Sequence, residues 1–104
     1  MKVLTIKSSV ILEFEKQKEV HFAFRMEHHT DYVFKPRGDQ KYSATIVLED
    51  SAPVIEKIIA ASVDFPDIPF MIDDLNMEEN TIERYHVKEG IVKEQLRSGW
   101  KWEE

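Results

Sequence analysis

The sequence predicts one α+β domain in which an antiparallel sheet is covered by an amphipathic helix. The chain has 104 residues, a length that suits a single domain, 1–104. Apolar and polar residues alternate through its first half, which is typical of strands, and the period becomes helical after residue 50. We therefore expect a four-stranded antiparallel β-meander, one helix on its aromatic face, and a short C-terminal β or β/α segment.

The strands are predicted from the parity of the large apolar residues, which fall on even positions from Leu4 to Leu48. Successive side chains of a strand point to opposite faces, so this parity indicates strands with one buried face. Polar or turn-forming residues interrupt the pattern at 15–19, 28–30 and 36–40. The expected strands are residues 2–14, 20–28, 31–35 and 41–48.

The same parity predicts how the strands pair, because a slip of one residue would turn the apolar set to solvent. Pairing Phe14 with Val20, and Phe34 with Tyr42, keeps the large side chains on one face. The other face has a thinner apolar set, which is either covered or forms an interface. Its members are Val3, Ile11, Ala23, Val33 and Val47.

Residues 52–63 are predicted to form the amphipathic helix. They follow the possible N-caps Asp50 and Ser51, and their isoleucines recur at helical spacing. The helix is expected to cover the aromatic face of the sheet. The prolines that follow, Pro66 and Pro69, predict an irregular connection.

The last third of the chain is less regular. Asp73 or Asp74 is a suitable cap for a short helical turn that reaches Glu79. Residues 81–88 resemble a strand. Residues 91–98 fit a short helix, and they fit the second strand of a hairpin nearly as well. Beyond them, Trp100 and Trp102 alternate with a lysine, as in an edge strand or a docked tail.

The charge of the chain is concentrated in one segment. The sequence contains 20 acidic and 14 basic residues, a formal charge of −6, which argues against direct binding of nucleic acid or anionic membranes. Residues 58–83 contain seven acids and no lysine or arginine. The candidate partner-binding residues are these acids and two apolar neighbours: Asp64, Asp67, Asp73, Asp74, Glu78, Glu79, Glu83, Phe70 and Met77.

The leading hypothesis is a small, acidic, non-enzymatic binding protein. Apolar anchors ringed by charge are typical of protein interfaces, so the segment 64–83 is predicted to engage a basic partner protein, such as a nucleic-acid-binding protein. The chain would then act as an inhibitor or adaptor. The same segment also fits a solvated loop that only keeps the protein soluble. The alternative function is a homo-oligomeric structural or assembly protein that uses the second sheet face.

No catalytic constellation or cofactor motif is found. The absence of cysteine excludes disulfides, thiolate nucleophiles and cysteine-based zinc sites. A small metal-dependent enzyme that uses Glu27, His29 and His86 is the third and least favoured hypothesis. Oxygen-bearing side chains alternate as in a calcium loop at Asp74, Asn76, Glu78 and Asn80. The match fails because Glu79 stands in place of the required glycine and Tyr85 in place of the bidentate glutamate. We expect no resident metal and no cofactor.

A soluble cytoplasmic protein is expected. No stretch approaches the roughly 18 apolar residues of a membrane span, and two lysines precede any apolar segment at the start of the chain. In composition, as a small acidic α+β protein without cysteine, the chain resembles many phage-encoded and mobile-element accessory proteins. That resemblance involves no particular residue.

Overall fold

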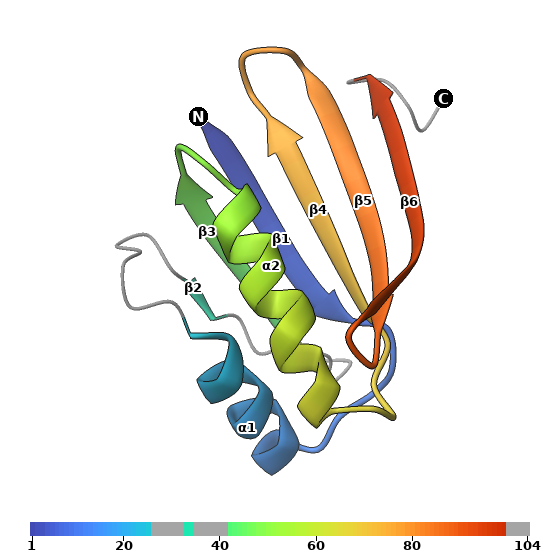
Figure 1. The fold of residues 1–104 in the computed structure, drawn as a ribbon. Coiled ribbons are helices and arrows are strands. Elements are labelled where there is room, and N and C mark those ends of the chain that lie inside the picture. Colours follow the sequence, from blue (N-terminus) through green and yellow to red (C-terminus); the bar gives the residue numbers. More distant parts are fainter. Residues whose placement is uncertain (26–32, 35–41, 100–104) are drawn as a thin grey trace.

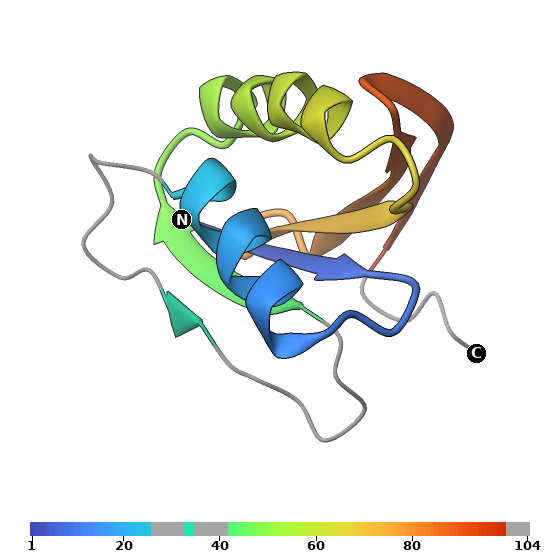
Figure 2. The ribbon, with the colours of Figure 1, turned by 90° about the horizontal axis from the view of Figure 1, so that it is seen from below.

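The computed structural model describes residues 1–25, 33–34 and 42–99. It confirms an α+β fold with an antiparallel sheet and a helix that packs on it. Two helices stand on the same face of the sheet (Figure 1), and the sheet has six strands in the order β2-β3-β1-β4-β5-β6. Seen from below, the sheet curls so that β6 rises toward the level of α2 (Figure 2).

The chain begins in the middle of this sheet. Strand β1 lies between β3 and β4, and every pair of neighbouring strands is antiparallel. Along the chain the elements are β1 (Lys2–Ser8), α1 (Phe14–Phe24), β2 (Val33–Phe34), β3 (Ser43–Leu48), α2 (Ala52–Ala61), the 3-10 turn η1 (Ser62–Asp64), β4 (Phe70–Asn76), β5 (Thr81–Lys88) and β6 (Ile91–Gly99).

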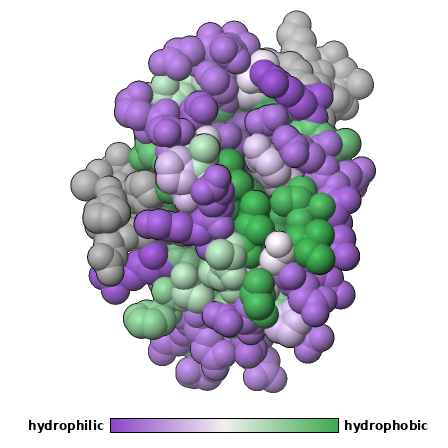
Figure 3. All heavy atoms as spheres, viewed as in Figure 1, coloured by the Kyte–Doolittle hydropathy of each residue, from purple (hydrophilic) through white to green (hydrophobic). Residues whose placement is uncertain are grey.

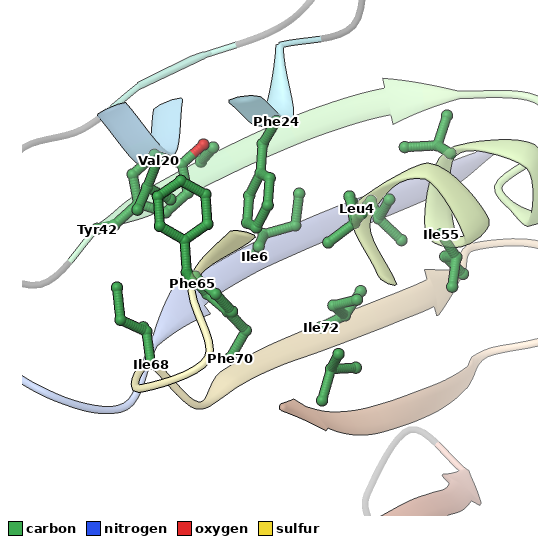
Figure 4. Close-up of a cluster of buried hydrophobic side chains, with 14 of the residues drawn as sticks. Leu4, Ile6, Val20, Phe24, Tyr42, Ile55, Phe65, Ile68, Phe70 and Ile72 are labelled. Carbon is green, nitrogen blue, oxygen red and sulfur yellow. The ribbon is translucent and has the colours of Figure 1, made fainter. Parts of the chain in front are cut away.

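The core lies between the helices and the even-numbered side chains of β1, β3 and β4. Leu4 and Ile6 are fully buried there, next to Ile46 of β3 and Ile72 of β4. An aromatic cluster closes the end of the core near α1 (Figure 4). Its ring centroids lie 4.9 to 6.4 Å apart in edge-on contacts and belong to Phe24, Tyr42, Phe65 and Phe70.

Helix α1 replaces the predicted turn at 15–19 and residues 20–24 of the predicted strand 20–28, whose last three residues lie outside the described part of the chain. Its buried side chains are Gln17, Val20 and Phe24, which are three and four residues apart and so share one helical face. Phe22, which the parity assigned to the aromatic face, is 76% exposed. The strand prediction was wrong because the large apolar residues of this stretch fall on even positions by coincidence and do not share one buried face. The charged residues between them suit a helix surface, where Lys16 and Glu19 form an ion pair.

The predicted meander is therefore wrong in its connections, although three of its four strands overlap observed ones, namely β1, β2 and β3. The first strand ends at Ser8 and not at residue 14, and it pairs with β3 and β4. The pairing of Phe14 with Val20 does not occur, since both lie in α1. Phe34 pairs with Ala44, two residues away from the predicted partner Tyr42.

Helix α2 confirms the prediction for residues 52–63. Val54, Ile55 and Ile58 form its buried face. The predicted caps have different roles from those expected. Asp50 accepts a hydrogen bond from the Ala52 amide, whereas the Ser51 hydroxyl donates to a carboxylate of β4. Ser51 thus links the start of α2 to the sheet.

The last third of the chain forms a three-stranded antiparallel unit. The helical turn predicted from Asp73 to Glu79 is wrong, because residues 70–76 form β4. The predicted strand 81–88 is confirmed. Residues 91–98 form the second strand of the hairpin and not the short helix. Its two turn residues, Glu89 and Gly90, both have positive φ, as a tight hairpin turn requires. Trp100 and Trp102 lie outside the described residues.

Candidate functional site

A polar pocket lies where β4 ends and β5 begins, on the sheet face that carries the helices. Its volume is about 250 Å³. Antiparallel pairing brings side chains from four strands to this end of the sheet. The residues that line the pocket are Lys2, Asp74, Asn76, Glu79, Thr81, Glu83 and Arg97.

The centre of the pocket contains two opposed carboxylates. Asp74 of β4 and Glu83 of β5 are direct cross-strand partners, so their side chains start about 5 Å apart on one face. Like charges in this position repel each other. Neither carboxylate forms an ion pair with a lysine or arginine in the described part of the chain.

Asp74 is the more deeply buried of the two, with 8% of its surface exposed. The Ser51 hydroxyl donates to its Oδ2 at 2.7 Å. Its other oxygen, Oδ1, is buried and accepts no hydrogen bond from any described residue. A buried carboxylate oxygen without a donor is unfavourable and rare in folded proteins.

Glu83 is held by two neutral donors. The Tyr85 hydroxyl donates to Oε1 at 3.1 Å, and the Gln95 amide donates to Oε2 at 3.3 Å. Burial raises the pKa of Tyr85 to about 12, and the negative charges of Glu83 and Asp74 add to this effect. The electrostatic potential around Glu83 and Asp74 is therefore negative.

Two basic side chains line the pocket beside this pair, and one of them, Arg97, is the direct cross-strand neighbour of Glu83. The Arg97 guanidinium lies 3.9 Å from Glu79, and both side chains are largely exposed, so the interaction is weak. Lys2 lines the pocket but forms no ion pair with another described residue.

The outer rim of the pocket is the turn between β4 and β5. Asn76 Oδ1 accepts hydrogen bonds from the amides of Glu78 and Glu79, which fixes the turn. The terminal ammonium group of Met1 pairs with Glu78 at 2.7 Å and lowers the pKa of this carboxyl group. Met77 is 44% exposed between the acids.

The structure divides the predicted acidic segment between distant places. Asp74, Glu78, Glu79 and Glu83 gather at the pocket and its rim, together with Met77; we call these five residues the acidic end. Asp64 and Asp67 are exposed at the opposite end of β4, roughly 20 Å away along seven strand residues. Phe70 is fully buried in the core, so it is a packing residue and offers no surface to a partner.

Asp73 also lies apart from the acidic end, because it points to the opposite face of the sheet. There it accepts two hydrogen bonds from Arg84, at 2.7 and 2.9 Å. This bidentate pair raises the pKa of Arg84. Asp73 is thus paired with a cation, whereas its neighbour Asp74 is not.

The opposite face is not covered by any described helix, and we call it the open face. Val3, Val47, Leu75 and Ile82 are cross-strand neighbours on it and are all half-buried. Val47 and Val3 belong to the apolar set that the sequence predicted for this face. Two other predicted members do not, since Ile11 is exposed before α1 and Ala23 of α1 packs against the core.

The helix-bearing side is mainly polar, with an apolar strip beside α2 (Figure 3). Val63 of η1 is exposed and lies against Gly90. Val92 of β6 is also exposed, and it pairs with the buried Val87.

The residues of the hypothetical metal site are not brought together by the described structure. His86 lies on β5 opposite Glu94, while Glu27 and His29 are outside the described residues. Within residues 1–25, 33–34 and 42–99, no group of three or more histidine, aspartate or glutamate side chains is placed to hold a metal ion.

Sequence reasoning missed the donors to the two carboxylates, which are Ser51 for Asp74 and Tyr85 for Glu83. The signal for a strand is weak here, because the apolar Met71 stands between Phe70 and Ile72. Reading this stretch as a strand would have placed Asp74 on the buried face.

Comparison with known protein families, with curated proteins and with solved structures finds no match to the chain. No helix in the described part is both long enough and apolar enough to span a membrane.

Proposed function

We propose that this chain is a non-enzymatic binding protein that engages a basic partner protein through the acidic end, as an inhibitor or adaptor. The observation that supports this proposal is the clustering of four carboxylates around the exposed Met77 at one end of the sheet. Such a surface attracts a cationic partner over long distances and offers it an apolar contact at close range.

Hydrogen bonds also hold the acidic end in one conformation. The rim turn is fixed by Asn76, and the base of the pocket is fixed by the hydrogen bonds of Ser51 and Tyr85. Rigid presentation lowers the entropy that is lost on binding. The acidic end therefore suits recognition better than a loop that serves only solubility.

The test compares charge reversal at the two ends of β4. A partner is first co-purified with the wild-type chain from its native host and identified by mass spectrometry. Replacing Glu78 and Glu79 by lysine is expected to weaken its binding about tenfold or more and to reduce the salt dependence of the affinity. The matched control replaces Asp64 and Asp67 by lysine, which changes the net charge equally at the far end. Equal loss of affinity in both variants would show that only the overall charge matters and would refute the proposal.

A second candidate function is homo-oligomeric assembly through the open face. The observation that favours it is the row of aliphatic side chains formed by Val47, Val3, Leu75 and Ile82 across four adjacent strands. An aliphatic row on an uncovered sheet face is a typical interface feature. This assembly would leave the acidic end free, because the pocket lies on the other face.

A further inference from the structure

Strand β6 forms one edge of the sheet (Figure 1). Its inner side pairs with β5, and no described strand lies on its outer side. Backbone groups on such an edge are able to pair with another strand. Three large apolar side chains of β6 are also exposed, namely Ile91, Val92 and Leu96. β6 is therefore a surface to which a further strand can be added.

A β-bulge limits the part of β6 that is able to pair. Residues 86–87 of β5 lie opposite Glu94 and Val92, so Lys93 is an extra residue without a partner on β5. A bulge bends its strand, and a lysine on an edge opposes the addition of another strand. The regular part of the edge is therefore residues 94–99.

This part of the strand fits a second copy of itself in one antiparallel register. A two-fold axis perpendicular to the sheet makes one residue of the strand face its own copy. An axis at Glu94 or at Arg97 would oppose two like charges. An axis at Gln95 would place Lys93 opposite Arg97 of the second copy, and an axis beyond Arg97 would leave too little of the strand to pair.

The remaining register has its axis at Leu96. This side chain is 39% exposed, and it would pack against Leu96 of the second copy, which removes both from water. Gln95 would lie opposite Arg97 of the second copy, so no like charges are opposed. Arg84 of β5 flanks Leu96, but its charge is already paired with Asp73. The charges of the strand thus favour a second copy in this register.

We propose that two copies of this chain join edge to edge through antiparallel β6 strands, with the two-fold axis at Leu96. The two six-stranded sheets then form one continuous sheet, and both helix-bearing faces lie on the same side of it. The contact involves residues 94–98 of each copy and is small, so we expect a dissociation constant of about 10–100 µM. The edge dimer is independent of the acidic end, and it leaves the open face uncovered.

Cysteine cross-linking tests the register directly, because the chain contains no cysteine. In Leu96→Cys the two introduced residues face each other with Cα atoms about 4.5–5.5 Å apart, a distance that suits a disulfide. Oxidised glutathione is expected to convert most of this variant to a covalent dimer at a protein concentration of about 100 µM. Gel electrophoresis without reductant measures the yield.

The same substitution at three neighbouring positions is the matched control. Glu94→Cys, Gln95→Cys and Arg97→Cys each place a cysteine on the same edge, but the register separates the two copies of it by roughly 7–13 Å along the strands. Each is expected to cross-link about fivefold more slowly than Leu96→Cys or worse. Fastest cross-linking at another of these positions, or equal rates at all four, would refute the register. No cross-link at any position would refute the edge dimer.

Sedimentation of cysteine-free variants separates the edge from the open face. Leu96→Glu places two carboxylates at the axis and is expected to weaken the dimer about tenfold or more. Ile91→Glu makes the same change outside the paired residues and is expected to have no effect. Ile82→Glu changes the open face and is expected to leave the edge dimer intact. If Ile82→Glu dissociates the dimer and Leu96→Glu does not, the copies meet through the open face and the edge dimer is wrong.

Discussion

Asp73 and Asp74 are neighbours in the sequence, yet the sheet gives them opposite surroundings. Alternation along β4 turns Asp73 to the open face, where Arg84 holds it in a bidentate ion pair. Asp74 turns to the helix-bearing face, where a serine hydroxyl is its donor. One carboxylate is paired with a cation, and the other has only a neutral donor.

The pair of Asp73 and Arg84 is expected to contribute measurably to stability. Their side chains are only 22% and 28% exposed, and charge-assisted bidentate contacts are stronger than ordinary surface ion pairs. We expect Asp73→Asn to lower the free energy of unfolding by about 1–2 kcal/mol in urea denaturation. A double-mutant cycle with Arg84→Met measures the coupling. A coupling energy near zero would show that the pair is no more than a solvated surface contact.

At the scale of elements, α2 and β5 could be predicted from the sequence, β6 was one of two alternatives for residues 91–98, and α1 could not be predicted. The isoleucines of α2 follow a helical period without ambiguity, and Glu89-Gly90 is a turn signal. In residues 14–24 the large apolar residues also fit a strand, and only packing decides between the two. The helix is the more stable conformation because Gln17, Val20 and Phe24 bury one face together. The Gln17 side-chain amide also donates a hydrogen bond to the Leu12 carbonyl.

One residue of the hairpin turn, Gly90, also contacts the 3-10 turn η1 that follows α2. Gly90 has φ +77° and donates its amide hydrogen to Ser62, while a Cβ atom at this position would lie 2.5 Å from Val63 Cγ2. The turn therefore docks directly onto the end of the helical segment.

We expect Gly90→Ala to lower the free energy of unfolding by about 2 kcal/mol, because it adds both backbone strain and a clash. The same substitution in a Val63→Ala background removes the clash and leaves the strain. We expect it to cost about 1 kcal/mol there. Chemical denaturation of the four proteins measures both values. An equal loss of unfolding free energy in both backgrounds would show that small shifts of Val63 relieve the clash without a measurable loss of stability.

The whole molecule has two unlike sheet faces, and this asymmetry separates its two candidate interfaces. The helix-bearing face ends in the charged pocket, and the open face is aliphatic around Leu75 and Ile82. The sequence predicted both a carboxylate-rich segment and a second apolar face. It could not predict how residues 58–83 divide between the faces, because that depends on β4 being a strand and on its register with β5.

On the assembly proposal, the protein is expected to sediment as a dimer at high concentration, and Ile82→Glu is expected to make it monomeric. A charge in the aliphatic row would be buried without a partner in the interface. Ile91→Glu is the matched control, since Ile91 is exposed at the start of the edge strand and lies outside the row. A wild-type chain that sediments as a monomer throughout would exclude this assembly.

The central position of β1 has a consequence for how the chain is made. β1 precedes the other described elements along the chain, yet its partners begin only at Ser43 and Phe70. The centre of the sheet therefore cannot close until most of the 104 residues exist, and pairing over such sequence separations is slow. Until then Leu4 and Ile6 lack their partner strands, and apolar side chains left exposed in this way make an incomplete chain prone to aggregation.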